Sequence, residues 1–113
     1  MQAPQSAALL RIYTEEGKQS GRRPLYEEIV LKARAFGLAG ATVLRGPMGF
    51  GQSATIHTAK ILDLSAKLPL VIEIVDSEDK IRAFLIELGG LHDLGLVTIE
   101  KVEVVHSGAG PSG

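Results

Sequence analysis

A strand, a helix and a second strand follow one another twice along this 113-residue chain, and this repeated order is its strongest constraint on folding. The first copy spans residues 8–44 and the second spans residues 68–105. A glycine-rich segment begins directly after the first copy. A chain of this length can bury the core of one domain without disulfides or metal, and it contains no cysteine. We therefore expect a single α+β domain made of two similar halves.

The first half is read from its alternation and its helix signals. Residues 8–14 alternate, with Leu10 and Ile12 on one face, and predict a strand. The polar residues 15–23 predict a loop. A helix is expected from Pro24, which suits a first turn, to Phe36, and Gly37 suits its left-handed end. Residues 41–44 predict a second strand.

The second half repeats this order without the long loop. Residues 68–76 alternate clearly and predict a strand. Asp76 or Ser77 can cap a helix that ends near Gly89 and Gly90. Residues 96–105 predict the last strand, with a β-bulge where the alternation breaks at residues 100–102. The segment 52–67 fits an extended arm, a short helix, or each in a different state.

Two helices on one face of an antiparallel sheet is the ferredoxin-like βαββαβ solution to this pattern. We expect a flexible N-terminus at residues 1–7, one domain at residues 8–106 and a flexible tail at residues 107–113. The loop at residues 18–23 is expected at the same sheet end as the junction between the strand 68–76 and the next helix, because each follows the first strand of its half.

Composition excludes several classes of function. Twelve Lys and Arg residues against thirteen Asp and Glu residues leave a net charge of -1, which argues against nucleic-acid binding. No apolar stretch approaches the roughly 20 residues that span a bilayer, and the N-terminus does not resemble a secretion signal, so a cytoplasmic protein is expected. The strand 68–76 has no aromatic platform for RNA bases. The absence of asparagine excludes acylphosphatase chemistry.

The glycine-rich segment 45–51 is the most distinctive local motif. Three glycines, Gly46, Gly49 and Gly51, would let backbone N–H groups approach an anion closely. The spacing matches neither the dinucleotide-binding nor the P-loop fingerprint, so a flexible hairpin tip is the plain alternative. The cations of residues 18–23 could likewise clamp an anion or simply be solvated.

Metal binding and catalysis have weaker support in the residues. His57, His92 and His106 lie far apart, without a partner at helical ligand spacing. No nucleophile elbow or paired-carboxylate motif is present. We therefore do not expect an enzyme.

The order of several motifs resembles the family called domain of unknown function 190, which is regarded as PII-like. The resemblance covers about Leu9 to Val105. It is carried by LRIY at 10–13, PLYE at 24–27, GATVLRGPMGFG at 40–51, IHT at 56–58 and LPLVIEIVD at 68–76.

More distantly, the chain resembles the PII signalling proteins. That resemblance implies a homotrimer that binds adenine nucleotides in clefts between subunits. It also implies a mobile loop, here Gly46 to about Lys60, that contacts a target such as a transporter or metabolic enzyme. The turn from Gly89 to Gly95 would match a second phosphate-contacting loop, but it has no lysine, and the long loop has no tyrosine. An adenine nucleotide, a smaller nucleotide or another anion therefore all stay open as the ligand.

The anion-contacting residues that follow from the motif and the resemblance are Arg45, Gly46, Gly49, Gly51, Lys60, Arg22 and Gly90. No cofactor is required by this hypothesis. The alternative is a metal-responsive or structural trimer that resembles the CutA group, which shares the architecture and binds no nucleotide.

Overall fold

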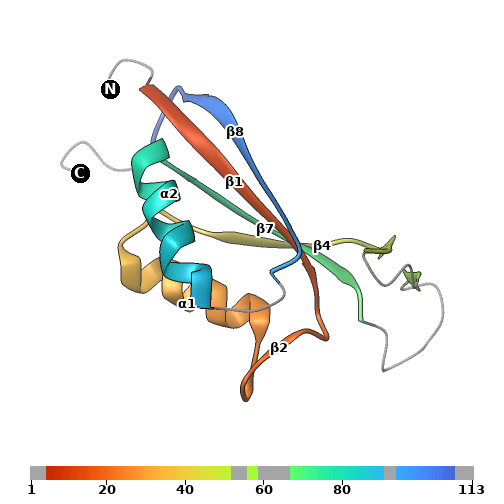
Figure 1. The fold of residues 1–113 in the computed structure, drawn as a ribbon. Coiled ribbons are helices and arrows are strands. Elements are labelled where there is room, and N and C mark those ends of the chain that lie inside the picture. The colour runs from red at the N-terminus through yellow and green to blue at the C-terminus, as the bar shows by residue number, and fades with distance from the viewer. Residues whose placement is uncertain (1–4, 52–55, 59–66, 91–93, 109–113) are drawn as a thin grey trace.

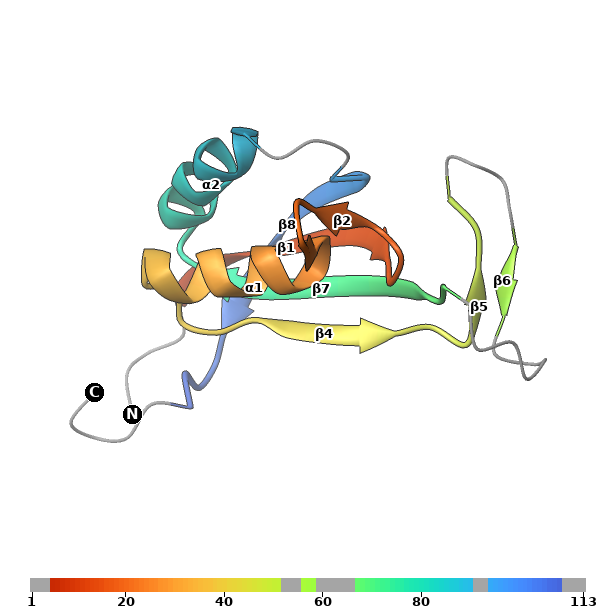
Figure 2. The ribbon, with the colours of Figure 1, turned by 90° about the horizontal axis from the view of Figure 1, so that it is seen from below.

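The computed structural model describes residues 5–51, 56–58, 67–90 and 94–108. Its centre is an antiparallel sheet with the strand order β4-β7-β1-β8, and the helices α1 and α2 pack on one face of it (Figures 1 and 2). The ferredoxin-like α+β fold is therefore confirmed. The elements are β1 (Gln5–Glu15), β2 (Gln19–Ser20), β3 (Arg23–Pro24), α1 (Leu25–Phe36), β4 (Thr42–Arg45), β5 (Met48–Gly49), β6 (His57–Thr58), β7 (Pro69–Asp76), α2 (Glu78–Glu87), the 3₁₀ turn η1 (Leu88–Gly90) and β8 (Leu96–Val104).

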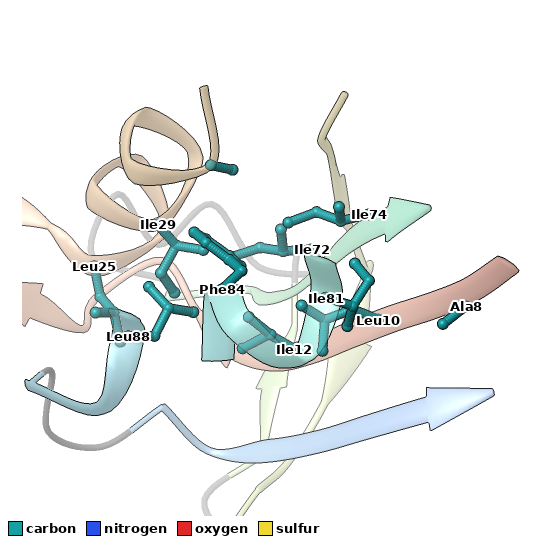
Figure 3. Close-up of a cluster of buried hydrophobic side chains, with 11 residues drawn as sticks. Ala8, Leu10, Ile12, Leu25, Ile29, Ile72, Ile74, Ile81, Phe84 and Leu88 are labelled. Atoms are coloured by element: carbon teal, nitrogen blue, oxygen red, sulfur yellow. The ribbon is translucent and has the colours of Figure 1, made fainter. Parts of the chain in front are cut away.

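The core lies between the helices and the two central strands. Leu10 and Ile12 of β1 are fully buried, and Figure 3 shows them beneath Ile81 and Phe84 of α2. The ring of Phe84 also packs on that of Phe36, with centroids 5.6 Å apart. Each such side chain contributes about 1.5–3 kcal/mol on burial. The alternating strands predicted from the sequence thus direct one face into this core, and their opposite face is left without a helix layer.

The expected β-bulge in the last strand is wrong. β1 and β8 pair without interruption from Gln5 opposite Val104 to Tyr13 opposite Leu96. Ile99 packs against the core, whereas Lys101 on the same face is exposed and lies near Glu78 at the start of α2. The break in alternation therefore marks the point along β8 where the helix-facing side chains change from apolar residues that contact the core to exposed charged residues.

Two boundaries also differ from expectation. β1 begins at Gln5, three residues before the expected strand, and Ala7 is buried. Pro24 is the residue before α1, with φ −56° and ψ 140°, because it still belongs to the short strand β3. The loop expected at residues 15–23 contains a hairpin, in which Gly21 takes a positive φ of 63° in a two-residue turn.

The predicted position of the 18–23 loop is wrong as well. Because β1 and β7 run antiparallel, Glu15 lies opposite Pro69 while Ala8 lies opposite Asp76. The β1–α1 connection is therefore at the opposite end of the sheet from the β7–α2 junction. It shares its end with the end of β4 and the start of β8, since Arg45 pairs with Leu70 and Leu96 with Tyr13.

A small arm extends from this same end of the sheet. β5 and β6 pair with Gly49 opposite His57, and they stand beyond the ends of β4 and β7, apart from the helices (Figure 2). For the segment 52–67, the sequence allowed an extended arm or a short helix. Residues 57 and 58 are extended, while residues 52–55 and 59–66 lie outside the described residues. Within the part of the chain that the structure describes, neither helix is long and apolar enough to cross a membrane.

Candidate functional site

A pocket of about 610 Å³ lies where the loops meet at this end of the sheet. Its walls come from the end of β1, the starts of β7 and β8, the β1–α1 connection and the glycine-rich arm. The lining residues are 13–15, Lys18, 49–51, 69–71 and 95–97, and we call this the loop-end pocket. Segments far apart in the sequence thus form one concave surface.

Glycines allow the chain to close around this pocket. Gly95 has φ 88°, and a side chain there would clash with the carbonyl oxygen of Tyr13. Gly46 and Gly49 lie against Pro69, since an added Cβ on either would be 3.1 Å from its Cγ. Among the residues that the structure describes, none has an atom within 4 Å of a Cβ added to Gly51. The first three glycines therefore serve close packing, whereas Gly51 is free to serve a ligand.

Glu16 joins the two ends of the arm segment. Its Oε2 lies 2.8 Å from Arg45 Nη2, and its Oε1 accepts a 3.0 Å hydrogen bond from the backbone N–H of Leu68. The backbone N–H of Glu16 also donates to the carbonyl of Leu68 at 3.0 Å. Beside it, the N–H of Gly46 donates to the carbonyl of Pro69 at 2.8 Å. The base of the arm is therefore held by one carboxylate and a short set of backbone bonds.

The three cations of the β1–α1 connection have different surroundings. Lys18 lines the loop-end pocket. Arg23 lies 3.0 Å from Glu28 and 3.8 Å from Glu27, so its charge is used at the start of α1. Arg22 is exposed in the turn of the hairpin and is not among the lining residues. Lys18 is therefore the cation that the structure brings to the pocket.

The seven residues predicted to contact an anion are not all together. Gly49 and Gly51 line the pocket, and Arg45 and Gly46 lie next to it at the base of the arm. Arg22 lies in the hairpin turn and Gly90 in η1, away from the lining residues, and Lys60 is outside the described residues.

Among the lining residues that the predicted set leaves out are four whose chemistry suits a ligand, and three of them lie in segments that the sequence did single out, 18–23, 46–60 and 89–95. The four are Tyr13, Lys18 as distinct from its neighbouring cations, Phe50 and Gly95. The sequence did contain a signal for Phe50. A large apolar side chain between two glycines does not belong to the buried face of a helix or strand, which suggests a role in binding. The positive φ of Gly95 was not readable before the strand register was known.

Metal ligands do not gather in the described part of the chain, where no group of three His, Asp or Glu side chains comes close enough to hold an ion. His106 accepts a 3.1 Å hydrogen bond at Nδ1 from the N–H of Gly108. His92 lies outside the described residues.

The sheet face opposite the helices, which we call the open face, is partly apolar. Leu44 is 48% exposed, Leu96 is 62% exposed and Tyr13 is 39% exposed. In the next cross-strand row of this face, Arg11 Nε and Glu73 Oε2 form a 3.0 Å ion pair across β1 and β7. The hydrogen bond to Glu73 raises the pKa of Arg11 above its ordinary value. The loop-end pocket opens beside this face, since Tyr13, Val71 and Leu96 belong to both.

Solved structures define the class of fold. A candidate PII-like signaling protein from Thermus thermophilus aligns with a TM-score of 0.66 at 17% identity, covering 92% of this chain and 94% of that one. CPII, a nitrogen regulatory PII-like protein from Thiomonas intermedia K12 bound to ADP and bicarbonate, aligns with a TM-score of 0.65 at 17% identity, covering 91% and 92%. The fold is therefore the PII-like variant of the ferredoxin-like fold.

Sequence comparison then gives the family. Residues 7–104 match DUF190, described as "Uncharacterized ACR". A UPF0166 protein of Aquifex aeolicus (strain VF5) is 43% identical over 98 residues, covering 87% of this chain and 92% of that protein. The UPF0166 protein MJ1524 of Methanocaldococcus jannaschii is 35% identical over 82 residues, covering 73% and 75%. The chain belongs to the DUF190 family, as its motifs predicted.

Proposed function

We propose that this protein is a PII-like regulatory protein that binds a small anionic ligand, an adenine nucleotide or a similar molecule, in the loop-end pocket. One observation carries the proposal: residues 49–51 of the arm form one wall of the pocket, while the central sheet and the β1–α1 connection form the others. A ligand held between them changes the position or freedom of the arm. The segment 46–60 then relays the state of the pocket to a target protein, such as a transporter or a metabolic enzyme.

The chemistry of the pocket supports a nucleotide-sized anion. Its volume of about 610 Å³ is within the range of small-molecule sites, roughly 300–1,000 Å³. Lys18 supplies a positive charge, and the backbone N–H groups of residues 49–51 can approach an oxyanion because two of these residues are glycines. The similarity to CPII, whose structures contain ADP and AMP, agrees with this ligand class.

The open face supports assembly into a homotrimer. Exposed Leu44 and Leu96 lose their contact with water if another subunit covers the face, at about 25 cal/mol per Å² of apolar surface. Because the loop-end pocket borders this face, a neighbouring subunit would complete its wall. We place this trimer in the cytoplasm and assign it regulation rather than turnover.

Calorimetry and thermal shift with AMP, ADP and ATP, compared with inorganic phosphate, test the ligand. We expect saturable binding of at least one nucleotide. Gly51→Leu should abolish it without loss of stability, because its side chain would enter the pocket at a point where no described residue has an atom within 4 Å of the added Cβ. Gly40→Leu is the matched control, since an added Cβ there also meets open space but lies outside the loop-end pocket. Binding of no nucleotide would overturn the sensor function, and a monomer by light scattering would overturn the assembly.

A further inference from the structure

The aromatic side chains divide into two groups. The chain has two tyrosines, three phenylalanines and no tryptophan. Phe84 is buried in the core, and Tyr26 and Phe36 pack against it. The remaining two, Tyr13 and Phe50, both line the loop-end pocket. Every aromatic ring that the core does not use is therefore placed at this one site.

Phe50 is exposed to a degree that its own fold does not explain. It is 70% exposed, although it lines the pocket. Across the pocket, Tyr13 is 39% exposed and stands on the sheet between Val71 and Leu96. The pocket thus has an aromatic and aliphatic floor on the sheet and an aromatic side chain on the arm.

We propose that Phe50 and Tyr13 are the residues that recognise the base of the ligand, a planar heteroaromatic ring, and that Phe50 stacks on it. This inference rests on the proposed function and deepens it. Flat π-systems bind between aromatic rings in offset or edge-to-face arrangements. Lys18, on the β1–α1 connection, then faces the phosphate, so the two ends of a nucleotide meet two different walls of the pocket.

The position of Phe50 gives this recognition a consequence for the arm. Phe50 lies next to β5, whereas Tyr13 lies on the rigid central strand β1. A base that stacks on Phe50 and contacts Tyr13 bridges the arm and the sheet. A ligand without a base makes no such bridge. The base, more than the phosphate, is therefore the part of the ligand that sets the position of the arm.

The test compares AMP with ribose 5-phosphate, which keeps the sugar and phosphate but has no base. Stacking of one base on an aromatic side chain is worth about 1–3 kcal/mol, or roughly 5-fold to 150-fold in affinity. We expect Phe50→Ala to lower the affinity for AMP by a factor in this range and to leave the affinity for ribose 5-phosphate unchanged. Met48→Ala is the matched control, because Met48 is 61% exposed on the same arm but does not line the pocket.

A second variant provides a direct signal. Since the chain has no tryptophan, Phe50→Trp introduces a single one, and its emission should change on titration with AMP but not with ribose 5-phosphate. If Phe50→Ala lowered the affinities for AMP and ribose 5-phosphate equally, or left the AMP affinity unchanged, the inference would be overturned while the proposed function stands. Failure of the unaltered protein to bind any adenine nucleotide would remove both.

Discussion

Replacing Glu16 should loosen the base of the arm by an amount that can be worked out from its contacts. Its hydrogen bond from the Leu68 N–H involves a charged acceptor on a side chain only 23% exposed, and such bonds contribute about 1.5–3 kcal/mol. The partner in its ion pair, Arg45, is 63% exposed, so that pair adds only about 0.2–1 kcal/mol. We therefore expect Glu16→Ala to lower the free energy of unfolding by about 2–4 kcal/mol.

The amide in Glu16→Gln separates the two contributions. Its oxygen can still accept from the Leu68 N–H, but as a neutral acceptor whose bond contributes only about 0.5–1.5 kcal/mol, and the ion pair is lost, so the expected cost is about 1–2 kcal/mol. Urea unfolding followed by circular dichroism measures both variants, at one protomer concentration because assembly would contribute to stability. Glu27→Gln is the control, because its 3.8 Å pair with Arg23 is half exposed and should contribute under about 0.5 kcal/mol. If Glu16→Ala costs no more than this control, the carboxylate does not hold the base of the arm.

Four further changes test other parts of the structure. Gly95→Ala should destabilise by more than about 1 kcal/mol, measured as urea midpoint, because its φ is positive and the methyl group meets the Tyr13 carbonyl. Ser77→Ala should cost about 1 kcal/mol by the same assay, since its Oγ accepts from the Lys80 N–H at 3.3 Å and caps α2. The hydrogen bond from Arg82 lowers the pKa of Glu78 from its ordinary value of 4.5. The ionised carboxylate therefore stabilises the fold above pH 4.5, and this stabilisation is lost as the pH falls through the folded-state pKa. Glu78→Gln should reduce the loss of stability between neutral and acidic pH. Leu44→Lys should shift the oligomer toward monomer in light scattering, and an unchanged mass would exclude the open face as the interface.

The fold was predictable where burial imposes a period on the sequence. Leu10 with Ile12, and Ile72 with Ile74, alternate because one face of each central strand is covered by helices. Local chemistry also identified the helix ends: Ser77 caps α2, and Gly37 closes α1 with a φ of 87°. These signals lie within a few residues of the feature that they predict.

Features that depend on distant partners were not predictable in the same way. The end of the sheet at which a loop lies follows from antiparallel pairing of Glu15 with Pro69, which no local pattern states. The same holds for the pocket, where Lys18, Phe50 and Gly95 meet only after three separate strands have paired. The glycine-rich motif identified the arm, but the strand register decides which of its neighbours face a ligand.

A ligand in the loop-end pocket should act on the arm, and hydrogen–deuterium exchange measured with and without saturating AMP or ADP reports this coupling. We predict slower exchange in peptides that cover residues 46–58, with a smaller change at residues 94–97 on the opposite wall. The α1 helix, which lies outside the pocket, should be unchanged and serves as the internal reference. Saturable binding that leaves exchange at residues 46–58 unaltered would show that the ligand does not act on the arm.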